Sequence, residues 1–335
     1  MSSSYKNLVF SGGGVLGIAY LGALRYFYEN EIISSIENLA GTSAGAITAC
    51  LSCFNLPFSE LETLLGSLDY SKVPDKDDQD DRIFNDNAEF RSIPKAIKAQ
   101  LDKIFGNIDC VYRLIKSYGW YSSQYFYTWI QQQIATQFDA SKKKPPYTFA
   151  DFENTSIHIN KRPFKKLFIV GTDISRSISR VFSYDATPNM EVAEAVRISM
   201  SVPLLFESIS SNLGDPQDTK ANLYVDGGML YNYPIDLFDK DYDLDETLGL
   251  YFNSINQSTS LNNIVEFISA SLSCTGSVQR TLLAMNPQNL KRSIPIYTSD
   301  ISSFDFNITT GDETYNFLVE QGYRAAEIYF SLLKS

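Results

Sequence analysis

Two motifs near the start of the chain contain residues that could perform chemistry. Residues 41–45 read Gly-Thr-Ser-Ala-Gly, a G-x-S-x-G pattern that places a serine on a sharp turn between a strand and a helix. Gly41 and Gly45 meet the need of such a turn for very small residues. Ser43 would stand at a helix N-terminus, where the macrodipole favours a developing anion. Ser43 is therefore a candidate nucleophile, although the same residues also suit a simple helix-capping turn.

The second motif is the glycine-rich stretch Phe-Ser-Gly-Gly-Gly-Val-Leu-Gly at residues 10–17. Its spacing fits the G-x-G-x-x-G loop of dinucleotide-binding proteins, but that loop needs an acidic residue at the end of the next strand. Glu37 lies at the start of that strand, and Ser43 follows its end. A Walker A loop fails as well, because no Gly-Lys-Ser/Thr follows. We therefore expect the loop to supply backbone N–H groups to an oxyanion and not to bind a pyrophosphate.

A serine nucleophile needs a base, and the sequence offers few candidates. The only histidine is His158, in the alternating stretch Ser-Ile-His-Ile-Asn, and it reads most simply as an ordinary histidine of a strand. Asp226 fits better, because an apolar strand delivers its carboxylate into a turn opened by Gly227 and Gly228. The alternative for Asp226 is an Asp-Gly turn in which the carboxylate bonds only its own backbone.

The predicted elements bring the first two motifs together. Residues 6–10 and 36–40 read as strands, and each is followed by a loop and a helix, the first helix at about 15–30. The carboxyl ends of neighbouring parallel strands meet at one edge of a sheet. We therefore expect the free N–H groups of the glycine loop to lie beside the hydroxyl of Ser43, as an oxyanion hole requires.

The rest of the chain continues as an α/β pattern with a helical insertion at about 56–150. Within the insertion, an acidic run at 75–81 is most simply a solvated loop. An aromatic cluster at 119–129 is most simply helix core, with a lipid-facing entrance as the alternative. Strands and helices alternate again after residue 150, and residues 156–160 read as the first of these strands.

Composition and charge exclude several classes of protein. The 335 residues carry a net charge of −11, which argues against nucleic acid as a partner. We see no signal-peptide pattern and no run of about 18 apolar residues, so we expect a cytoplasmic protein without a membrane span. Cys50 and Cys53 share one face of an expected helix, and with a single histidine the chain offers no metal site. We expect no cofactor.

Taken together, the motifs resemble those of the patatin-like phospholipases. The glycine loop, the G-x-S-x-G elbow and the Asp-Gly-Gly turn occur in the family's order, and Ala-Val-Arg-Ile-Ser-Met-Ser-Val-Pro at 195–203 resembles its helix end before the last motif. The resemblance covers about residues 6–330. It implies one three-layer α/β/α domain over residues 1–335, with a mostly parallel central sheet.

The resemblance also implies roles for individual residues. Ser43 would be the nucleophile and Asp226 the base that activates it. The oxyanion hole would be formed by the backbone of Gly12, Gly13, Gly14 and Val15, and the motifs would be supported by Gly17, Gly41, Gly45, Gly227 and Gly228. Leu16 stands where many members have Arg or Lys. Arg197 would anchor structure near the elbow.

The implied activity is hydrolysis of fatty acyl esters of phospholipids or lysophospholipids through an acyl-enzyme on Ser43. Two alternatives use the same dyad, a lipase for neutral glycerolipids and a transacylase, and a third is a non-catalytic scaffold that binds lipid or a partner. We expect peripheral contact with a membrane, for which the basic clusters at 142–144 and 161–166 are candidates. Gating by an activating partner, a ligand or a lid, and secretion as an effector without a signal peptide, are further hypotheses.

Overall fold

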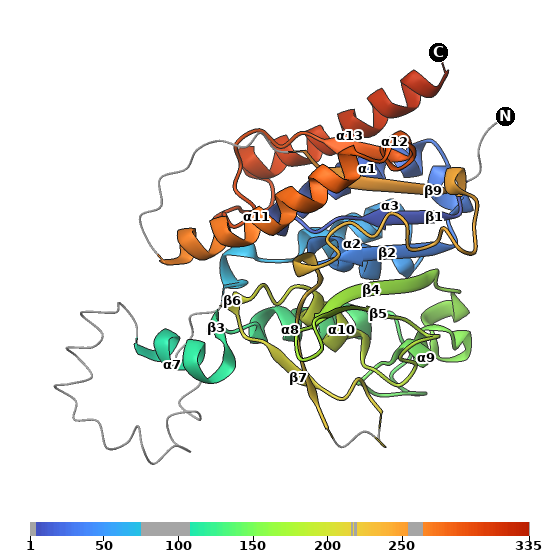
Figure 1. Cartoon of the computed structure of the whole chain (residues 1–335). Helices are drawn as coiled ribbons and strands as arrows, with labels where there is room; N and C mark the ends of the chain where they lie inside the picture. Colours follow the sequence, from blue (N-terminus) through green and yellow to red (C-terminus); the bar gives the residue numbers. More distant parts are fainter. Residues whose placement is uncertain (1–4, 75–107, 216, 218–219, 254–263, 335) are drawn as a thin grey trace, which may run out of the picture.

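A computed structural model of the chain describes residues 5–74, 108–215, 217, 220–253 and 264–334 (Figure 1). A largely parallel sheet forms its centre, with strands in the order β10, β9, β1, β2, β4, β8, β7 and with β5 beside β4. The parallel strands are β1 (Asn7–Phe10), β2 (Asn38–Thr42), β4 (Lys166–Asp173), β9 (Thr247–Phe252) and β10 (Ser293–Ile296). The antiparallel strands are β5 (Ile178–Phe182), β7 (Ile209–Ser211) and β8 (Asn222–Asp226).

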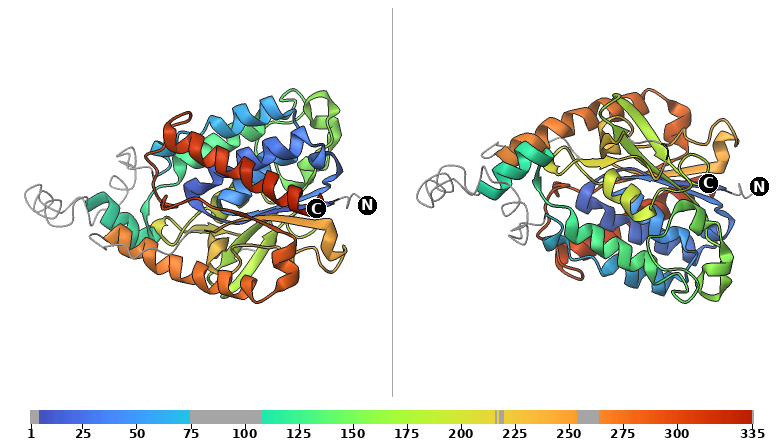
Figure 2. Two further views of the ribbon diagram at one scale, coloured as in Figure 1. Left: turned by 90° about the horizontal axis from the view of Figure 1, so that it is seen from above. Right: turned by 90° about the horizontal axis from the view of Figure 1, so that it is seen from below.

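Helices cover both faces of this sheet (Figure 2). On one face lie α1 (Ala19–Glu29), α2 (Ala44–Cys53), α3 (Phe58–Gly66) and α13 (Glu313–Lys334), and α11 (Ile264–Ala284) lies on the other. The other α-helices of the described residues are α7 (Ile108–Ser117), α8 (Gln124–Ala135), α9 (Phe149–Phe152), α10 (Val192–Ser199) and α12 (Pro287–Lys291). β3 (Gly119–Tyr121) pairs with β6 (Leu204–Phe206) in a separate ribbon. The predicted α/β class with a largely parallel central sheet is confirmed.

The apolar run in β1 explains why this strand is central. Leu8 and Phe10 belong to the large core beneath α1, α2 and α13, whereas Val9 packs with Ala40 and Phe238 on the opposite face. All three side chains of the run are fully buried. A strand with both faces buried is a continuous apolar run and not an alternating one.

Two glycines bring the first and last helices of the chain into backbone contact. A Cβ atom on Gly22 of α1 would lie 1.8 Å from the carbonyl oxygen of Val319, and one on Gly322 of α13 would lie 1.7 Å from that of Ala19. No side chain fits at either position. α13 therefore packs directly on the helix that follows the glycine loop.

Parts of the predicted element pattern were wrong. Residues 156–160 were predicted as a strand, but they form two short 3-10 turns, η5 (Thr155–Ile157) and η6 (Ile159–Lys161), with a positive φ of 54° at Asn160. The first helix begins later than predicted, because the 3-10 turn η1 (Gly14–Ile18) precedes α1. In the insertion, the acidic run at 75–81 lies outside the described residues.

The aromatic cluster at 119–129 is mostly core, as its simpler interpretation predicted. Phe126 and Trp129 of α8 are buried, and the indole of Trp129 donates a hydrogen bond to the hydroxyl of Ser67 at 3.0 Å. Cys50 and Cys53 are buried side by side on α2, as predicted. Within the described part of the chain, no helix combines the length and hydropathy that a membrane crossing requires.

Candidate active site

Ser43 stands on a strained turn between β2 and α2. Its φ and ψ of 54° and −121° lie in a region that side-chain-bearing residues rarely adopt, and such strain concentrates at functional sites. The turn depends on its two glycines. A Cβ on Gly41 would lie 2.1 Å from the carbonyl oxygen of Gly45, and a Cβ on Gly45 would lie 2.4 Å from that of Phe10. The prediction that the serine sits on a sharp elbow is confirmed, and the simple capping turn is not, because the Ser43 side chain makes no capping hydrogen bond.

The end of α10 holds the backbone on both sides of the candidate dyad. The N–H of Ser43 donates to Oγ of Ser199 at 2.8 Å, and that hydroxyl donates to the carbonyl of Val170 at 2.6 Å. Two residues further on, the carbonyl of Ser201 accepts the N–H of Asp226 at 2.8 Å. Ser199 and Ser201 therefore fix the serine and the aspartate relative to one helix end, a role that the sequence analysis missed although it noted this segment.

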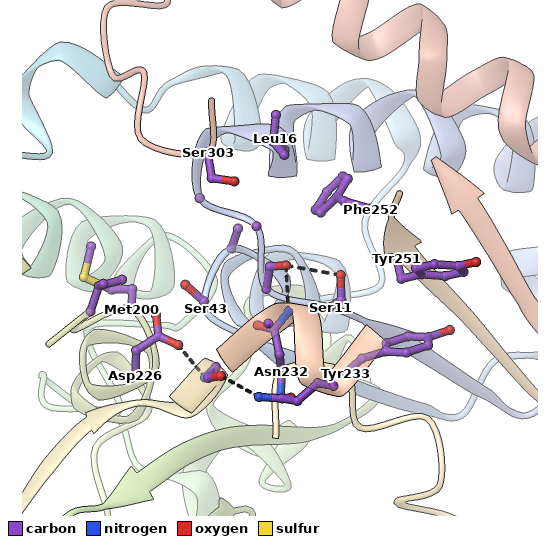
Figure 3. Close-up of a pocket in the computed structure, with 18 of the residues that line it drawn as sticks. Ser11, Leu16, Ser43, Met200, Asp226, Asn232, Tyr233, Tyr251, Phe252 and Ser303 are labelled. Atoms are coloured by element: carbon purple, nitrogen blue, oxygen red, sulfur yellow. Dashed lines mark hydrogen bonds between the residues drawn. The ribbon is translucent and has the colours of Figure 1, made fainter. Parts of the chain in front are cut away.

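Asp226 ends β8 and is 4% exposed, with its carboxyl group beside the Ser43 hydroxyl (Figure 3). The N–H of Gly228 donates to its Oδ1 at 2.6 Å. Burial raises the pKa of Asp226 from 3.8 to about 7, although the hydrogen bonds from the Ser43 hydroxyl and the Gly228 N–H both act to lower it. The result is a carboxylate that holds a proton far more strongly than an exposed one and titrates near neutral pH.

The glycine loop leaves the sheet beside Ser43. Phe10 pairs with Gly41 in the β1–β2 register, so the loop and the elbow emerge at the same edge. The two ends of the loop are already bonded, because the Gly12 N–H donates to the carbonyl of Asn232 and the Val15 N–H to that of Ser303, both at 3.0 Å.

Between these anchors, the N–H groups of Gly13 and Gly14 have no acceptor among the described residues. Gly14 has a φ of 56°, and a Cβ there would lie 2.0 Å from the Ser303 carbonyl oxygen. A Cβ on Gly13 would strike the ring of Phe252 at 2.3 Å. The loop thus requires glycine at the two positions whose donors are open.

Helix α11 ties the glycine loop to the aspartate turn. The side-chain amide of Gln279 donates to the carbonyl of Gly228 at 2.9 Å, and its carbonyl oxygen accepts the N–H of Asn232 at 2.6 Å. Asn232 in turn donates from Nδ2 to the Gly12 carbonyl at 3.3 Å. Gln279 and Asn232 had no motif to mark them, because both act only through contacts made after the chain has folded.

These residues line a cavity of about 430 Å³. Ser43, Asp226 and the glycine loop contribute polar groups to its lining. Leu16 and Phe252 lie across the loop from the dyad (Figure 3). Phe126 of the aromatic cluster also contributes to the lining. Much of the remaining lining is apolar, which suits a ligand with a polar ester and a long hydrocarbon chain.

The remaining glycines of the three motifs are packed against the site. A Cβ on Gly17 would lie 2.8 Å from that of Ala44, and a Cβ on Gly227 would lie 2.4 Å from the Val170 carbonyl oxygen. A Cβ on Gly228 would lie 2.9 Å from Oδ1 of Asp226. Each glycine therefore keeps a neighbouring segment close to the dyad.

The basic clusters lie away from this cavity. Residues 161–166 lead into the amino end of β4, whereas the cavity lies at the carboxyl ends of the parallel strands. Lys142 pairs with Asp139 at 3.3 Å, Lys143 pairs with Asp151, and the Lys165 ammonium donates to backbone carbonyls. The structure thus gives these lysines local roles in the fold.

Arg197 also lies outside the lining of the cavity. Its guanidinium pairs with Glu207 at 2.7 Å, donates to Ser123 at 2.7 Å and lies over the ring of Tyr127. These contacts anchor α10, the helix whose end holds Ser43 and Asp226. The structural role expected for Arg197 agrees with this geometry.

Comparison with known proteins identifies the family. A family model described as patatin-like phospholipase matches residues 8–239, which include the glycine loop, the elbow and the Asp-Gly-Gly turn. The chain belongs to the patatin-like phospholipase family. This patatin-like chain also extends beyond the matched region, because β9, β10, α11 and α13 complete the sheet and its cover.

Two viral proteins are similar to this patatin-like chain. It is 29% identical over 330 residues to the uncharacterized protein R571 of Acanthamoeba polyphaga mimivirus, with 94% of this chain and 91% of that protein covered. It is 25% identical over 234 residues to the probable lipid hydrolase 463L of Invertebrate iridescent virus 6, with 70% and 63% covered. Among solved structures, VipD from Legionella pneumophila shares the fold with a TM-score of 0.60 and 20% identity, over 98% of this chain and 67% of that one.

His158 lies in an aromatic cluster away from the cavity. Its ring stacks on Phe164 with centroids 3.8 Å apart, and its Nδ1 and Nε2 atoms lie 2.8 and 2.9 Å from the carbonyl oxygens of Arg162 and Asp151. It is 1% exposed and does not contribute to the cavity lining.

Replacing His158 with alanine should therefore leave ester turnover per folded molecule nearly unchanged. The same substitution should lower the free energy of unfolding by about 2 kcal/mol, because it removes the ring that packs in the aromatic cluster and faces the two carbonyl oxygens. Active-site titration combined with thermal unfolding measures both effects. A large loss of kcat in properly folded protein would instead assign the base role to His158.

Proposed function

We propose that this patatin-like chain is a lipid acyl hydrolase that uses a Ser43-Asp226 dyad. The observation that carries the proposal is the buried carboxyl of Asp226 beside the strained Ser43, with a pKa of about 7. A carboxylate of ordinary pKa is a poor base for a serine hydroxyl, and burial makes this one stronger. The family and the name of the iridescent virus relative, probable lipid hydrolase, support lipid as the substrate.

In the proposed reaction, Asp226 accepts the hydroxyl proton while Oγ of Ser43 attacks the ester carbonyl. The carbonyl oxygen becomes an oxyanion, and collapse of the tetrahedral intermediate expels the alcohol, which takes up the proton. Water then attacks the acyl-enzyme with Asp226 again as base, releasing the fatty acid and the free serine. The carboxylate is regenerated at the end of each cycle.

We propose that the Gly13 and Gly14 N–H groups form the core of the oxyanion hole. The sequence offered four donors, from Gly12 to Val15, but the two outer N–H groups already donate to Asn232 and Ser303. Preorganised donors of this kind stabilise charge that develops only in the transition state. The outer two bonds then hold the loop in the shape that aims the inner donors.

Exposed apolar side chains beside the cavity have the chemistry of a surface that contacts lipid. Val278 and Leu282 of α11 and Met285, directly after the helix, have exposed apolar side chains, and the spacing of Val278 and Leu282 places them on one side of the helix. Leu282 also lines the cavity. We propose that peripheral contact with a lipid surface occurs at these side chains.

We also propose that residues 1–335 act as one domain, because β9 and β10 belong to the same sheet as β1.

Product analysis separates the proposed hydrolase from the alternatives. We expect lysophospholipid incubated in water enriched in heavy oxygen to yield fatty acid with the label in its carboxyl group, because water resolves the acyl-enzyme. A transacylase would instead transfer the unlabelled acyl group to an added alcohol or a second lipid. A scaffold would release nothing above the background of a Ser43→Ala control, and that result would contradict the proposal.

A further inference from the structure

Arg280 on α11 is the one cationic side chain among the described residues that line the cavity. The other charged lining residues are Asp226 and Asp236. The glycine loop presents the apolar Leu16 to the same cavity and contributes no charge. The described part of the lining thus offers a negatively charged ligand group one cationic side chain, in a chain whose net charge is −11.

The guanidinium makes one of its contacts with its own helix. Nη2 of Arg280 donates to Oγ of Ser277 at 2.8 Å, and Nη1 lies 3.5 Å from the place that a Cβ on Gly276 would occupy. The side chain therefore lies back along α11 over a glycine that leaves room for it. Gly276 and Thr275 also line the cavity, so this stretch of helix forms part of its wall.

Arg280 directly follows Gln279, which contacts the aspartate turn. Gln279 bonds the Gly228 carbonyl and the Asn232 N–H, which links α11 to the segments around Asp226 and Gly12. Gln279 thus holds this part of α11 against the segments that carry the proposed catalytic groups, and Arg280 is the next residue along the helix. The planar set of five N–H donors on its guanidinium matches the oxygens of a phosphate group.

We propose that Arg280 forms a phosphate-recognition subsite, which makes the substrate a phosphate-bearing glycerolipid in preference to a neutral glyceride. This inference rests on the proposed hydrolase function and specifies its substrate class. With the ester carbonyl at Ser43 and the acyl chain in the apolar part of the cavity, the head-group phosphate lies toward α11 and accepts hydrogen bonds from Arg280. The guanidinium serves recognition and takes no part in bond breaking.

The test compares two substrates with the same acyl chain, 1-oleoyl-lysophosphatidylglycerol and 1-oleoylglycerol, in mixed micelles of a neutral detergent. We expect R280M to lower kcat/KM for the phosphate-bearing substrate by about 10- to 100-fold, the loss typical of a charge-assisted hydrogen bond. Turnover of 1-oleoylglycerol should be unchanged, and R280K should restore part of the preference. Added salt should narrow the gap between the two substrates in the wild type.

A matched control removes a positive charge elsewhere. Arg324 on α13 is exposed and pairs with Glu320 within its own helix, so R324M should leave both substrates unaffected. An equal loss of both activities in R280M would assign Arg280 a structural role and overturn the subsite. Unchanged preference in R280M would overturn it as well.

Two further outcomes have separate meanings. Inorganic phosphate could compete with a nitrophenyl ester in the wild type but not in R280M, while the wild type shows no preference between the two lipids. That result would overturn the assignment of the subsite to a lipid head group. If Ser43→Ala abolishes turnover of both lipids and R280M has no effect, the phosphate subsite is overturned and the proposed hydrolase function is supported. Absence of turnover of either lipid by the wild type would overturn the proposed function itself.

Discussion

Replacing Ser43 with alanine should lower kcat/KM for a short-chain nitrophenyl ester by about 10³-fold or more, because the acyl-enzyme cannot form without the hydroxyl. The substitution should leave the fold intact. Ser43 is held through its backbone N–H by Ser199, and its side chain makes no capping bond that alanine would lose. Circular dichroism and thermal unfolding serve as the structural controls. Turnover near the wild-type rate in folded Ser43→Ala protein would place the nucleophile elsewhere.

The neighbouring Ser199 offers a matched comparison for this result. Ser199→Ala removes a hydroxyl of the same kind, 2.8 Å from the Ser43 N–H, without touching the nucleophile. We expect a smaller loss of activity from it, since the elbow loses one hydrogen bond and keeps Oγ of Ser43. Comparable losses in the two variants would mean that the position of the elbow, and not the Ser43 hydroxyl, limits the rate.

Asp226→Asn should reduce kcat by about 10² to 10⁴-fold, the usual contribution of a general base. Asparagine keeps the shape of the side chain and can still accept the Gly228 N–H, so the loss reports the missing base. In the wild type, kcat/KM should rise about tenfold per pH unit at low pH and level off above the Asp226 pKa of about 7. A flat profile across neutral pH would contradict the assignment.

The same substitution should make the protein more stable at neutral and alkaline pH. The pKa of Asp226 is 3.8 when exposed and about 7 when folded, so the folded chain binds the proton more strongly than the unfolded chain. The wild type therefore loses stability as the pH rises from about 4 to 7, and the loss is complete above 7. Asp226→Asn has no charge to bury. Its advantage in Tm should be absent near pH 4, grow across this window and then remain constant.

The site could be predicted from sequence where its chemistry imposes local backbone demands. The elbow needs tiny residues at Gly41 and Gly45 because their Cβ atoms would strike backbone carbonyls, and such demands leave a readable motif. Asp226 was predicted in the same way, from an apolar strand that runs into Gly227 and Gly228. The roles of the side chains in the reaction remain predictions until the variants are measured.

Other parts of the site left no such signal. Asn232 and Gln279 act through contacts between segments far apart in the chain, and nothing local sets them apart from other polar residues. The sequence could not narrow the four predicted oxyanion-hole donors to the two that we propose, since only the folded structure shows which N–H groups of the loop already have acceptors. The prediction of a strand around His158 was wrong. The alternating residues there form tight turns, and His158 packs in an aromatic cluster.

The contact between α1 and α13 and the pairing of β1 with β9 have a consequence for the order in which the enzyme becomes active. The glycine loop and Ser43 are synthesised early. β1 lacks β9, its second neighbouring strand, until residues 247–252 have been made, and α1 lacks its packing partner until α13 has been made. Long-range contacts of this kind form late. A nascent chain thus carries Ser43 without a finished candidate site until α13 has been made, and the proposed lipid hydrolysis depends on that helix.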